Sequence, residues 1–489
     1  MRRPRQFCLT QLPGARGHVP RTACKETPSL GVPGATTPAV MRLWRLLVQV
    51  ALGAALACPA VTVRAQQWNV TRLQLKNGLT ILALEDHTVP AVSYYTVFKV
   101  GSRNERPGIT GLSHLFEHMM FNGSAQYKPK VFDQQIEAGG GSSNAFTGAD
   151  STEYYEEFSS GALDIVLRME ADRMRALKLD RANLEQERGI VSEERRVNTD
   201  NSVDGSMSER LWNSAFVAHP YRWDTIGFMK DIQAIRLEDA KIYFRTYYAP
   251  NNAVVAVVGD FSTPDLLRRM TLYFSDIPRQ PAPPPVVNAE PSQQGERRID
   301  YHRPAELAAV LIGYKSISYK SPADPTLDIL SSILAGGESS RLYRSLVYEK
   351  QIAASVTAGN ESRIDPGLFT FHAQVQQGHT TAECEMAIYA AIEEIQKSGV
   401  TERELQKARN GLRVGTINRY KTNRGRAGLL AENEAFWGTW KQLYRVLPLY
   451  DRVTAADVQR AAVKYLDPLN RTVVTLVPQK EPRQPGGSQ

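Results

Sequence analysis

The chain has 489 residues, too many for one ordinary hydrophobic core, so two or more domains are expected. Its 42% hydrophobic and 22% charged residues are typical of a globular protein and exclude a largely disordered one. The net charge of +8 comes from residues 1–65, which hold nine of the 59 basic residues and one of the 51 acidic ones; the remainder carries 50 of each. Composition therefore gives no reason to expect a nucleic-acid partner.

Residues 41–65 have the order of a secretory signal peptide. Arg42 and Arg45 precede an apolar run, and Val63-Arg64-Ala65 is similar to a small-residue cleavage site. The run is shorter than the roughly 20 residues that a membrane span needs. We therefore expect cleavage near Ala65, a periplasmic or secreted protein, and no stable membrane span in the mature chain. The alternatives are an over-extended start over residues 1–40 and a mitochondrial transit peptide that leads to the matrix.

From residue 68 onward, strand patterns alternate with helical ones. Segments 71–86 and 91–102 are rich in β-branched and aromatic residues and predict strands, with a turn at Asn77-Gly78. The later patterns of this half are helical at 111–121, 129–138, 161–177 and 180–199, strand and turn at 139–158, and a buried strand at 251–261.

The Pro-rich, polar segment 278–297 is typical of an exposed, stiff linker and divides the mature chain. After it, the order of strand, turn and helix repeats, and "NRTVVTLVP" ends the second half as "NNAVVAVVGDF" ends the first. Where the first copy carries His114 to His118, the second has Asp328 to Ser332. The sequence thus predicts an α/β fold of the α+β sandwich type, with two homologous half-domains, 66–277 and 298–489, and chemistry in only the first.

The stretch "SHLFEHMMFNGS", residues 113–124, carries the first candidate metal ligands. His114 and His118 lie four residues apart, so on a helix they share a face and can present ring nitrogens to one ion. Glu117 can lean over the same site. Zinc accepts imidazole and carboxylate ligands, and in catalytic sites it takes three protein ligands and a water.

A third ligand is therefore expected from elsewhere, preferably from a downstream helix. The segment 184–198 offers Glu187 and Glu194, which lie two helical turns apart and share a face. The alternative is that both segments are solvated faces of surface helices, as charged runs usually are.

His114-Leu115-Phe116-Glu117-His118 resembles the inverted zinc motif of the pitrilysin and insulin-degrading enzyme family, which includes the mitochondrial processing peptidases. In that family the third ligand is a glutamate in a downstream segment of the form Glu-Arg-x-x-Val-x-x-Glu, which "ERGIVSEE" matches. The resemblance implies Glu194 as the ligand and Glu187 as a supporting carboxylate, with Glu193 the alternative if the register shifts by one. It covers nearly all of 68–480 and implies half-domains that form half of a clamshell-like chamber.

The activity that the resemblance implies is zinc-dependent hydrolysis of peptide bonds in unfolded peptides or small proteins. One Zn²⁺ per chain would activate a water, and Glu117 would act as the general base. Asn144, Ala145 and Phe146 resemble the family's edge strand, to which substrate adds as an extra β-strand. For Phe146, simple packing is the alternative interpretation.

The sequence departs from self-sufficient members of the family in its second half. Those members carry an Arg and a Tyr that help to bind substrate, after a segment that Ser339-Ser340-Arg341-Leu342 matches. Their counterparts here are Tyr348 and Ala354. This favours the zinc-bearing subunit of a heterodimer, with a homologous partner that supplies Arg and Tyr. A homodimer, a β subunit of the mitochondrial-processing-peptidase type, and a non-catalytic assembly subunit are the alternatives.

Overall fold

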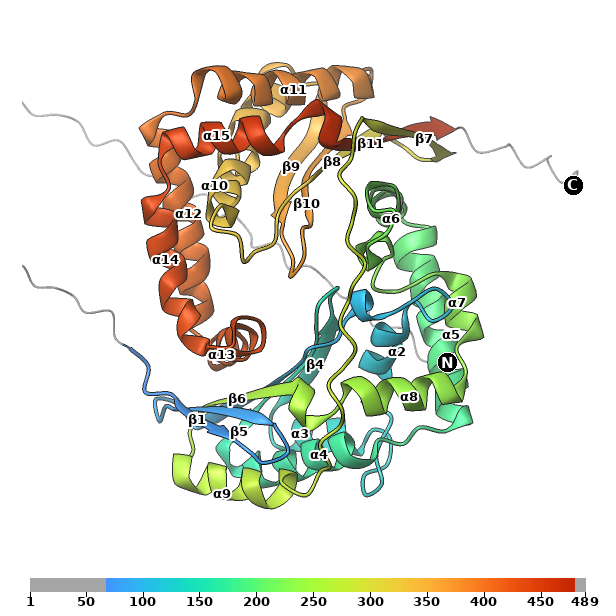
Figure 1. Ribbon diagram of the computed structural model, residues 1–489, viewed down its shortest axis with the longest axis vertical. Coiled ribbons are helices and arrows are strands. Elements are labelled where there is room, and N and C mark those ends of the chain that lie inside the picture. The colour runs from blue at the N-terminus through green and yellow to red at the C-terminus, as the bar shows by residue number, and fades with distance from the viewer. Residues whose placement is uncertain (1–66, 480–489) are drawn as a thin grey trace, which may run out of the picture. The chain divides into compact units, whose positions relative to one another are not determined.

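The computed structural model describes residues 67–479, which contain two mixed β-sheets and the helices that pack on them (Figure 1). The expected signal peptide lies outside these residues. No helix in the described range is long and apolar enough to cross a membrane.

The first sheet has six strands in the order β1-β2-β6-β3-β5-β4. These strands are β1 (Thr71–Gln74), β2 (Thr80–Glu85), β3 (Ala91–Phe98), β4 (Ser142–Thr147), β5 (Thr152–Ser159) and β6 (Ala253–Gly259). The helices of this half are α2 (Leu112–Met119), α3 (Val131–Ala138), α4 (Leu163–Ala176), α5 (Arg181–Arg195), α6 (Val203–Ala215), α7 (Met229–Ala234), α8 (Leu237–Tyr247) and α9 (Thr263–Phe274). Every residue of β6 is buried, which is typical of a strand covered on both faces.

The second sheet has five strands in the order β7-β11-β8-β10-β9. These strands are β7 (Arg297–Pro304), β8 (Ala309–Lys315), β9 (Ala353–Glu361), β10 (Leu368–Val375) and β11 (Arg471–Gln479). The helices are α10 (Asp324–Ala335), α11 (Thr381–Ser398), α12 (Glu402–Tyr420), α13 (Asn423–Trp437), α14 (Leu443–Arg452) and α15 (Ala455–Tyr465).

The two sheets share one pairing scheme, which confirms the predicted α/β fold with two homologous halves. In the second sheet β7 is parallel to β11, as β2 is to β6 in the first. From β6 the first sheet continues through antiparallel pairs to its edge strand β4, and from β11 the second sheet continues in the same way to its edge strand β9. The strands β4 and β9 therefore have equivalent edge positions. Strands β7, β9 and β10 were not among the predicted strands.

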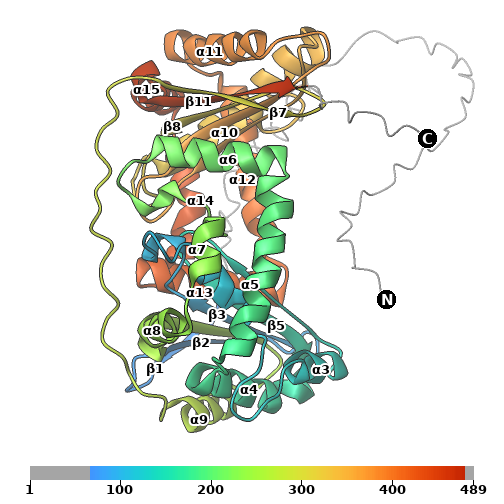
Figure 2. The ribbon, with the colours of Figure 1, turned by 90° about the vertical axis from the view of Figure 1, so that its right-hand side faces the viewer.

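One helix from each half packs on the sheet of the other half (Figures 1 and 2). Helix α6 packs on β8 and β11, where Met207 and Leu211 are buried against Val474. Helix α13 packs on β3 and β6, where Leu430 is buried against Val254. Burial of apolar area stabilises both contacts, so each half is packed against a helix of the other.

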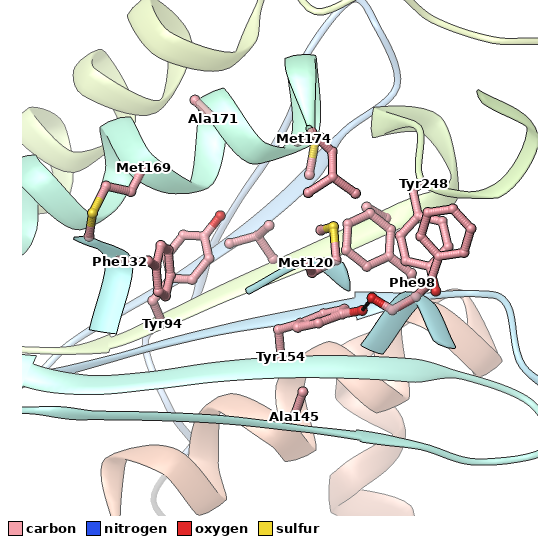
Figure 3. Packing of buried hydrophobic residues seen from close by; sticks show 14 of the residues in the cluster. Tyr94, Phe98, Met120, Phe132, Ala145, Tyr154, Met169, Ala171, Met174 and Tyr248 are labelled. Atoms are coloured by element: carbon pink, nitrogen blue, oxygen red, sulfur yellow. Dashed lines mark hydrogen bonds between the residues drawn. The ribbon is translucent and has the colours of Figure 1, made fainter. Parts of the chain in front are cut away.

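Aromatic packing between the first sheet and its own helices supports α2 from behind (Figure 3). Phe98 and Tyr154 meet edge to face with their ring centroids 5.9 Å apart. The Tyr154 hydroxyl donates a 3.2 Å hydrogen bond to the carbonyl of Phe116, inside α2. Met120, at the end of α2, and Tyr248 complete this cluster. The helix that carries both histidines therefore rests on a closely packed base.

The predicted linker runs without helix or strand between α9 and β7 (Figure 2). It is anchored at Glu290, whose carboxylate accepts hydrogen bonds from the backbone N–H groups of residues 217–219 at 2.9–3.1 Å. Lys315 of β8 pairs with the same carboxylate at 2.6 Å. Glu290 thus ties the linker to both halves.

Candidate metal centre

Helix α2 begins where its geometry needs a glycine. Gly111 has φ +87°, and a Cβ there would lie 2.3 Å from the carbonyl oxygen of Ile226. The buried carboxylate of Glu105 accepts hydrogen bonds from the N–H groups of Gly111 and Ser113 at 2.8 and 2.7 Å, which satisfies the free donors of the first turn. Burial raises the pKa of Glu105 to about 8, although these donors act in the opposite direction.

The apolar side of α2 faces the core and leaves the polar side toward α5 and β4. Leu112, Leu115, Phe116 and Met119 are buried. The two histidines and Glu117 lie on the other side, and α2 contacts both α5 and β4. Helical periodicity alone therefore separates packing residues from candidate ligands.

His114, His118 and Glu194 converge on one point. One ligand atom from each lies within 4.8 Å of the others, and no other such set occurs within residues 67–479. Glu194 Oε2 lies 3.3 Å from His118 Nε2 and 3.8 Å from His114 Nε2. Zinc bonds of about 2.0–2.1 Å in a tetrahedron place ligand atoms roughly 3.3 Å apart, so this donor set fits zinc.

Glu187 supports the second histidine, one layer behind the ligands. Its buried carboxylate lies 3.3 Å from His118 Nδ1. A carboxylate on the far nitrogen of a ligating imidazole fixes the ring and directs Nε2 toward the ion. Glu193, the alternative ligand, has a 65% exposed side chain and pairs with Arg196 at 2.6 Å. It lies outside the convergent set.

The charges of the site favour a cation. Burial lowers the pKa of His114. Burial also acts against a charged His118, but its contacts with Glu187 and Glu194 outweigh this and raise its pKa to about 9. The hydrogen bond with His118 is the main cause that lowers the pKa of Glu194. The two carboxylates that hold a proton on His118 also favour a metal cation, which would displace that proton and bind the neutral imidazole beside the ionised Glu194.

Glu117 lies beside the ligands and is held from the edge strand. The Thr147 hydroxyl donates a 2.7 Å hydrogen bond to Glu117 Oε2. Thr147 was not predicted, because it lies 30 residues away and belongs to no spacing pattern. This contact fixes one carboxylate oxygen and leaves the other for a proton.

The expected substrate strand lies at the edge of the first sheet. Within the described range, β4 pairs with β5 only, so its other side carries no strand. Asn144 is exposed, Phe146 is 43% exposed, and Ala145 is buried toward the core. An edge strand with free main-chain groups can accept an extended peptide by backbone pairing.

In the second half, residues 298–479 as the structure describes them hold no comparable site. Arg341 is held by Glu404 through contacts of 2.7 and 3.0 Å. Tyr348 lies in the helical turn Tyr343–Glu349 with 75% exposure. Asp328 of α10, at the place equivalent to the histidines, accepts a 2.7 Å hydrogen bond from the Tyr450 hydroxyl.

Comparison with known proteins identifies the family of the chain. The family model described as Insulinase (Peptidase family M16) matches residues 80–227, and the one described as the Peptidase M16 inactive domain matches residues 234–412. The chain belongs to peptidase family M16, as the resemblance of its motif predicted. The candidate ligands fall within the first match.

Among the relatives, the chain is 33% identical to the zinc protease PqqE of Helicobacter pylori, over 83% of this chain and 92% of that protein. It is 24% identical to a probable mitochondrial-processing peptidase subunit beta of Arabidopsis thaliana, over 80% of this chain and 75% of that protein. A crystal structure of a protease from Helicobacter pylori superposes with a TM-score of 0.81 at 32% identity, covering 84% of this chain and all of that one. Family and relatives support a metallopeptidase that uses zinc.

Proposed function

We propose that the chain is a zinc-dependent metalloendopeptidase that binds one Zn²⁺ through His114, His118 and Glu194. The observation that carries this proposal is the convergence of these three side chains beside Glu117 at an open sheet edge. A zinc ion held there supplies Lewis acidity, which polarises the scissile carbonyl and makes water more acidic.

The chain's own residues supply the remaining steps. An extended peptide pairs with the main chain of β4 next to Glu117. Glu117 takes a proton from the attacking water and returns it to the leaving amine, as a general base and then a general acid. Thr147 holds the carboxylate in position for both transfers, and Glu187 keeps His118 oriented.

Cleavage of a quenched fluorescent peptide library by the zinc-loaded chain from residue 66 tests the proposal. We expect activity, from the chain alone or after mixing with a homologous subunit, that a chelator abolishes and zinc restores, and that the Glu117→Gln variant lacks. A Glu117→Gln variant as active as the parent would show that Glu117 is not the general base.

We further propose that the chain is the catalytic subunit of a heterodimer. The support is that Arg341 is engaged by Glu404, while Tyr348 and Ala354 stand where self-sufficient members carry Arg and Tyr. Activity that appears only on mixing with a homologous subunit supports this assignment. Full activity of a monomer contradicts it, and full activity of a homodimer favours the alternative stated above.

The expected signal peptide at residues 41–65 supports a periplasmic or secreted protein. N-terminal sequencing of the mature protein tests this, since cleavage near Ala65 favours export. The similarity to a probable mitochondrial-processing peptidase subunit beta supports the alternative location, the mitochondrial matrix. Folded, zinc-loaded protein that stays inactive with any homologous subunit would favour an assembly role.

A further inference from the structure

An open cavity lies between the two halves, and three arginines lie in or beside it. Two of them form ion pairs with acidic residues, and Arg363 does not. Arg103 pairs with Asp150 at 3.6 Å. Arg419 pairs with Glu432 at 2.6 Å. Within residues 67–479, the side chain of Arg363 stacks on Trp212 and Tyr221 and forms no hydrogen bond or ion pair. It is the one guanidinium of the three whose charge is left for a ligand.

Stacking holds this free guanidinium in place. Arg363 lies in the loop between β9 and β10, with its Cζ 3.7 Å from the ring centroid of Trp212 and 4.8 Å from that of Tyr221. Burial lowers the pKa of Arg363, but a guanidinium stays charged at neutral pH. A stacked guanidinium keeps its N–H edge available, which is the geometry that binds carboxylates.

The acids nearest to Arg363 are engaged by other donors. Glu361 accepts a 2.9 Å hydrogen bond from the Thr370 hydroxyl. Asp150 accepts a 2.7 Å hydrogen bond from the Tyr221 hydroxyl. No carboxylate therefore forms a direct contact with the guanidinium of Arg363, and its positive charge is not neutralised by an ion pair.

The cavity has a volume of about 370 Å³ and one aromatic wall. Tyr319 and Trp437 meet there with ring centroids 5.5 Å apart, and Trp437 is 37% exposed. The Tyr319 hydroxyl is buried and has no hydrogen-bond partner within the described residues. Tyr319 therefore lines the cavity with its ring, while its hydroxyl is turned away from solvent.

The cavity lies at the end of the edge strand. Its lining includes Gly148, the residue directly after Thr147, which ends β4 and contacts Glu117. A peptide that pairs along β4 therefore leads from the region of Glu117 to this cavity.

We propose that this cavity is a subsite for a peptide carboxylate, which Arg363 binds while the aromatic wall packs on an adjacent side chain. The carboxylate is either the peptide's C-terminus or the side chain of Asp or Glu. The proposal deepens the peptidase function and rests on it. The guanidinium supplies paired, charge-assisted hydrogen bonds, and the wall supplies apolar contact.

Binding of four labelled peptides to the zinc-loaded Glu117→Gln chain tests the subsite, with fluorescence anisotropy as the readout. The peptides share one sequence and differ in a free or amidated C-terminus and in one internal Glu or Gln. We expect one of the two carboxylates to tighten binding roughly ten-fold, the size of a charge-assisted hydrogen bond. The effective pair identifies the source of the carboxylate. Equal binding of all four peptides overturns the proposal.

Two variants assign the effect to Arg363. Arg363→Met keeps much of the stacking volume but removes the charge, and it should abolish the preference while the uncharged peptide binds as before. Arg363→Lys should keep part of the preference. Arg268→Met on α9, at an exposed position, is the control and should change nothing. Equal weakening of every peptide by Arg363→Met indicates a structural role and overturns the assignment.

Because binding is measured without turnover, the proposed subsite and the proposed peptidase function are tested independently of each other. A chain that cleaves peptides but ignores their carboxylates contradicts the subsite alone. A chain that selects carboxylates but never cleaves contradicts the peptidase function and supports the subsite. In the active parent, the same preference should appear in KM, with kcat nearly unchanged.

Discussion

The hydroxyl of Thr147, the last residue of the edge strand, donates a 2.7 Å hydrogen bond to the carboxylate of Glu117 on α2, the helix that carries the candidate histidine ligands. This contact joins the proposed base to the strand that would hold the substrate. Proton transfer depends on the position of the carboxylate, so the hydroxyl should matter for turnover more than for binding.

Thr147→Val keeps the shape of the side chain but removes the donor. We expect kcat to fall about ten-fold, with KM and zinc content unchanged, since a hydrogen bond to a charged group contributes about 1.5 kcal/mol. Thr147→Ser should recover most of the activity. Steady-state kinetics with one fluorogenic peptide measure this, and a valine variant as fast as the parent would show that Glu117 needs no such support.

Glu194 and Glu193 are adjacent in sequence but differ in role. We expect Glu194→Ala to weaken zinc binding more than about 100-fold, because a ligand is lost and not only a supporting group. Glu193→Ala should leave affinity unchanged, since its exposed side chain contacts Arg196 instead. Competition with a chromophoric chelator measures both affinities. The reverse order would place Glu193 in the metal site.

Glu290 should make stability depend on pH in a defined window. Burial opposes its ionisation, but Lys315 and the N–H groups of residues 217–219 outweigh this and lower its pKa from 4.5 to about 2. A lowered pKa in the folded state stabilises above pH 4.5, and the gain is lost as pH falls toward 2. Glu290→Gln should therefore reduce the free energy of unfolding by about 1–3 kcal/mol at neutral pH.

Urea denaturation of Glu290→Gln and its parent across this window tests the sign. The difference between the two proteins should shrink steadily as the pH is lowered, because the parent's carboxylate is then protonated as well. A difference that stays constant with pH would mean that packing, and not charge, explains the effect.

Leu430 tests the exchange of helices between the halves. Its side chain is fully buried between α13 and the first sheet, so Leu430→Ala should destabilise the protein by about 2–5 kcal/mol. Val414→Ala on α12, at a 57% exposed position, is the control and should change stability by less than about 0.5 kcal/mol. Calorimetry should show one transition in each protein. Two separate transitions would mean that the halves unfold independently.

The sequence by itself determined the local features of this protein. Helical spacing predicted that His114 and His118 share a face, and the two-turn interval of Glu187 and Glu194 predicted a second ligand-bearing helix. Alternation and turn residues predicted most strands, and the repeated order of elements predicted two similar halves. These features depend on neighbours within a few residues, so they are visible in the chain itself.

Only the tertiary structure decided which side chains meet across the fold. It brought Glu194, and not Glu193, to the two histidines, Thr147 to Glu117 and Arg363 to Trp212. It also decided that α6 and α13 pack on the sheet of the opposite half. An amphipathic helix shows in its sequence that one face must be buried, but the partner that buries it depends on contacts between distant segments, which local periodicity does not encode.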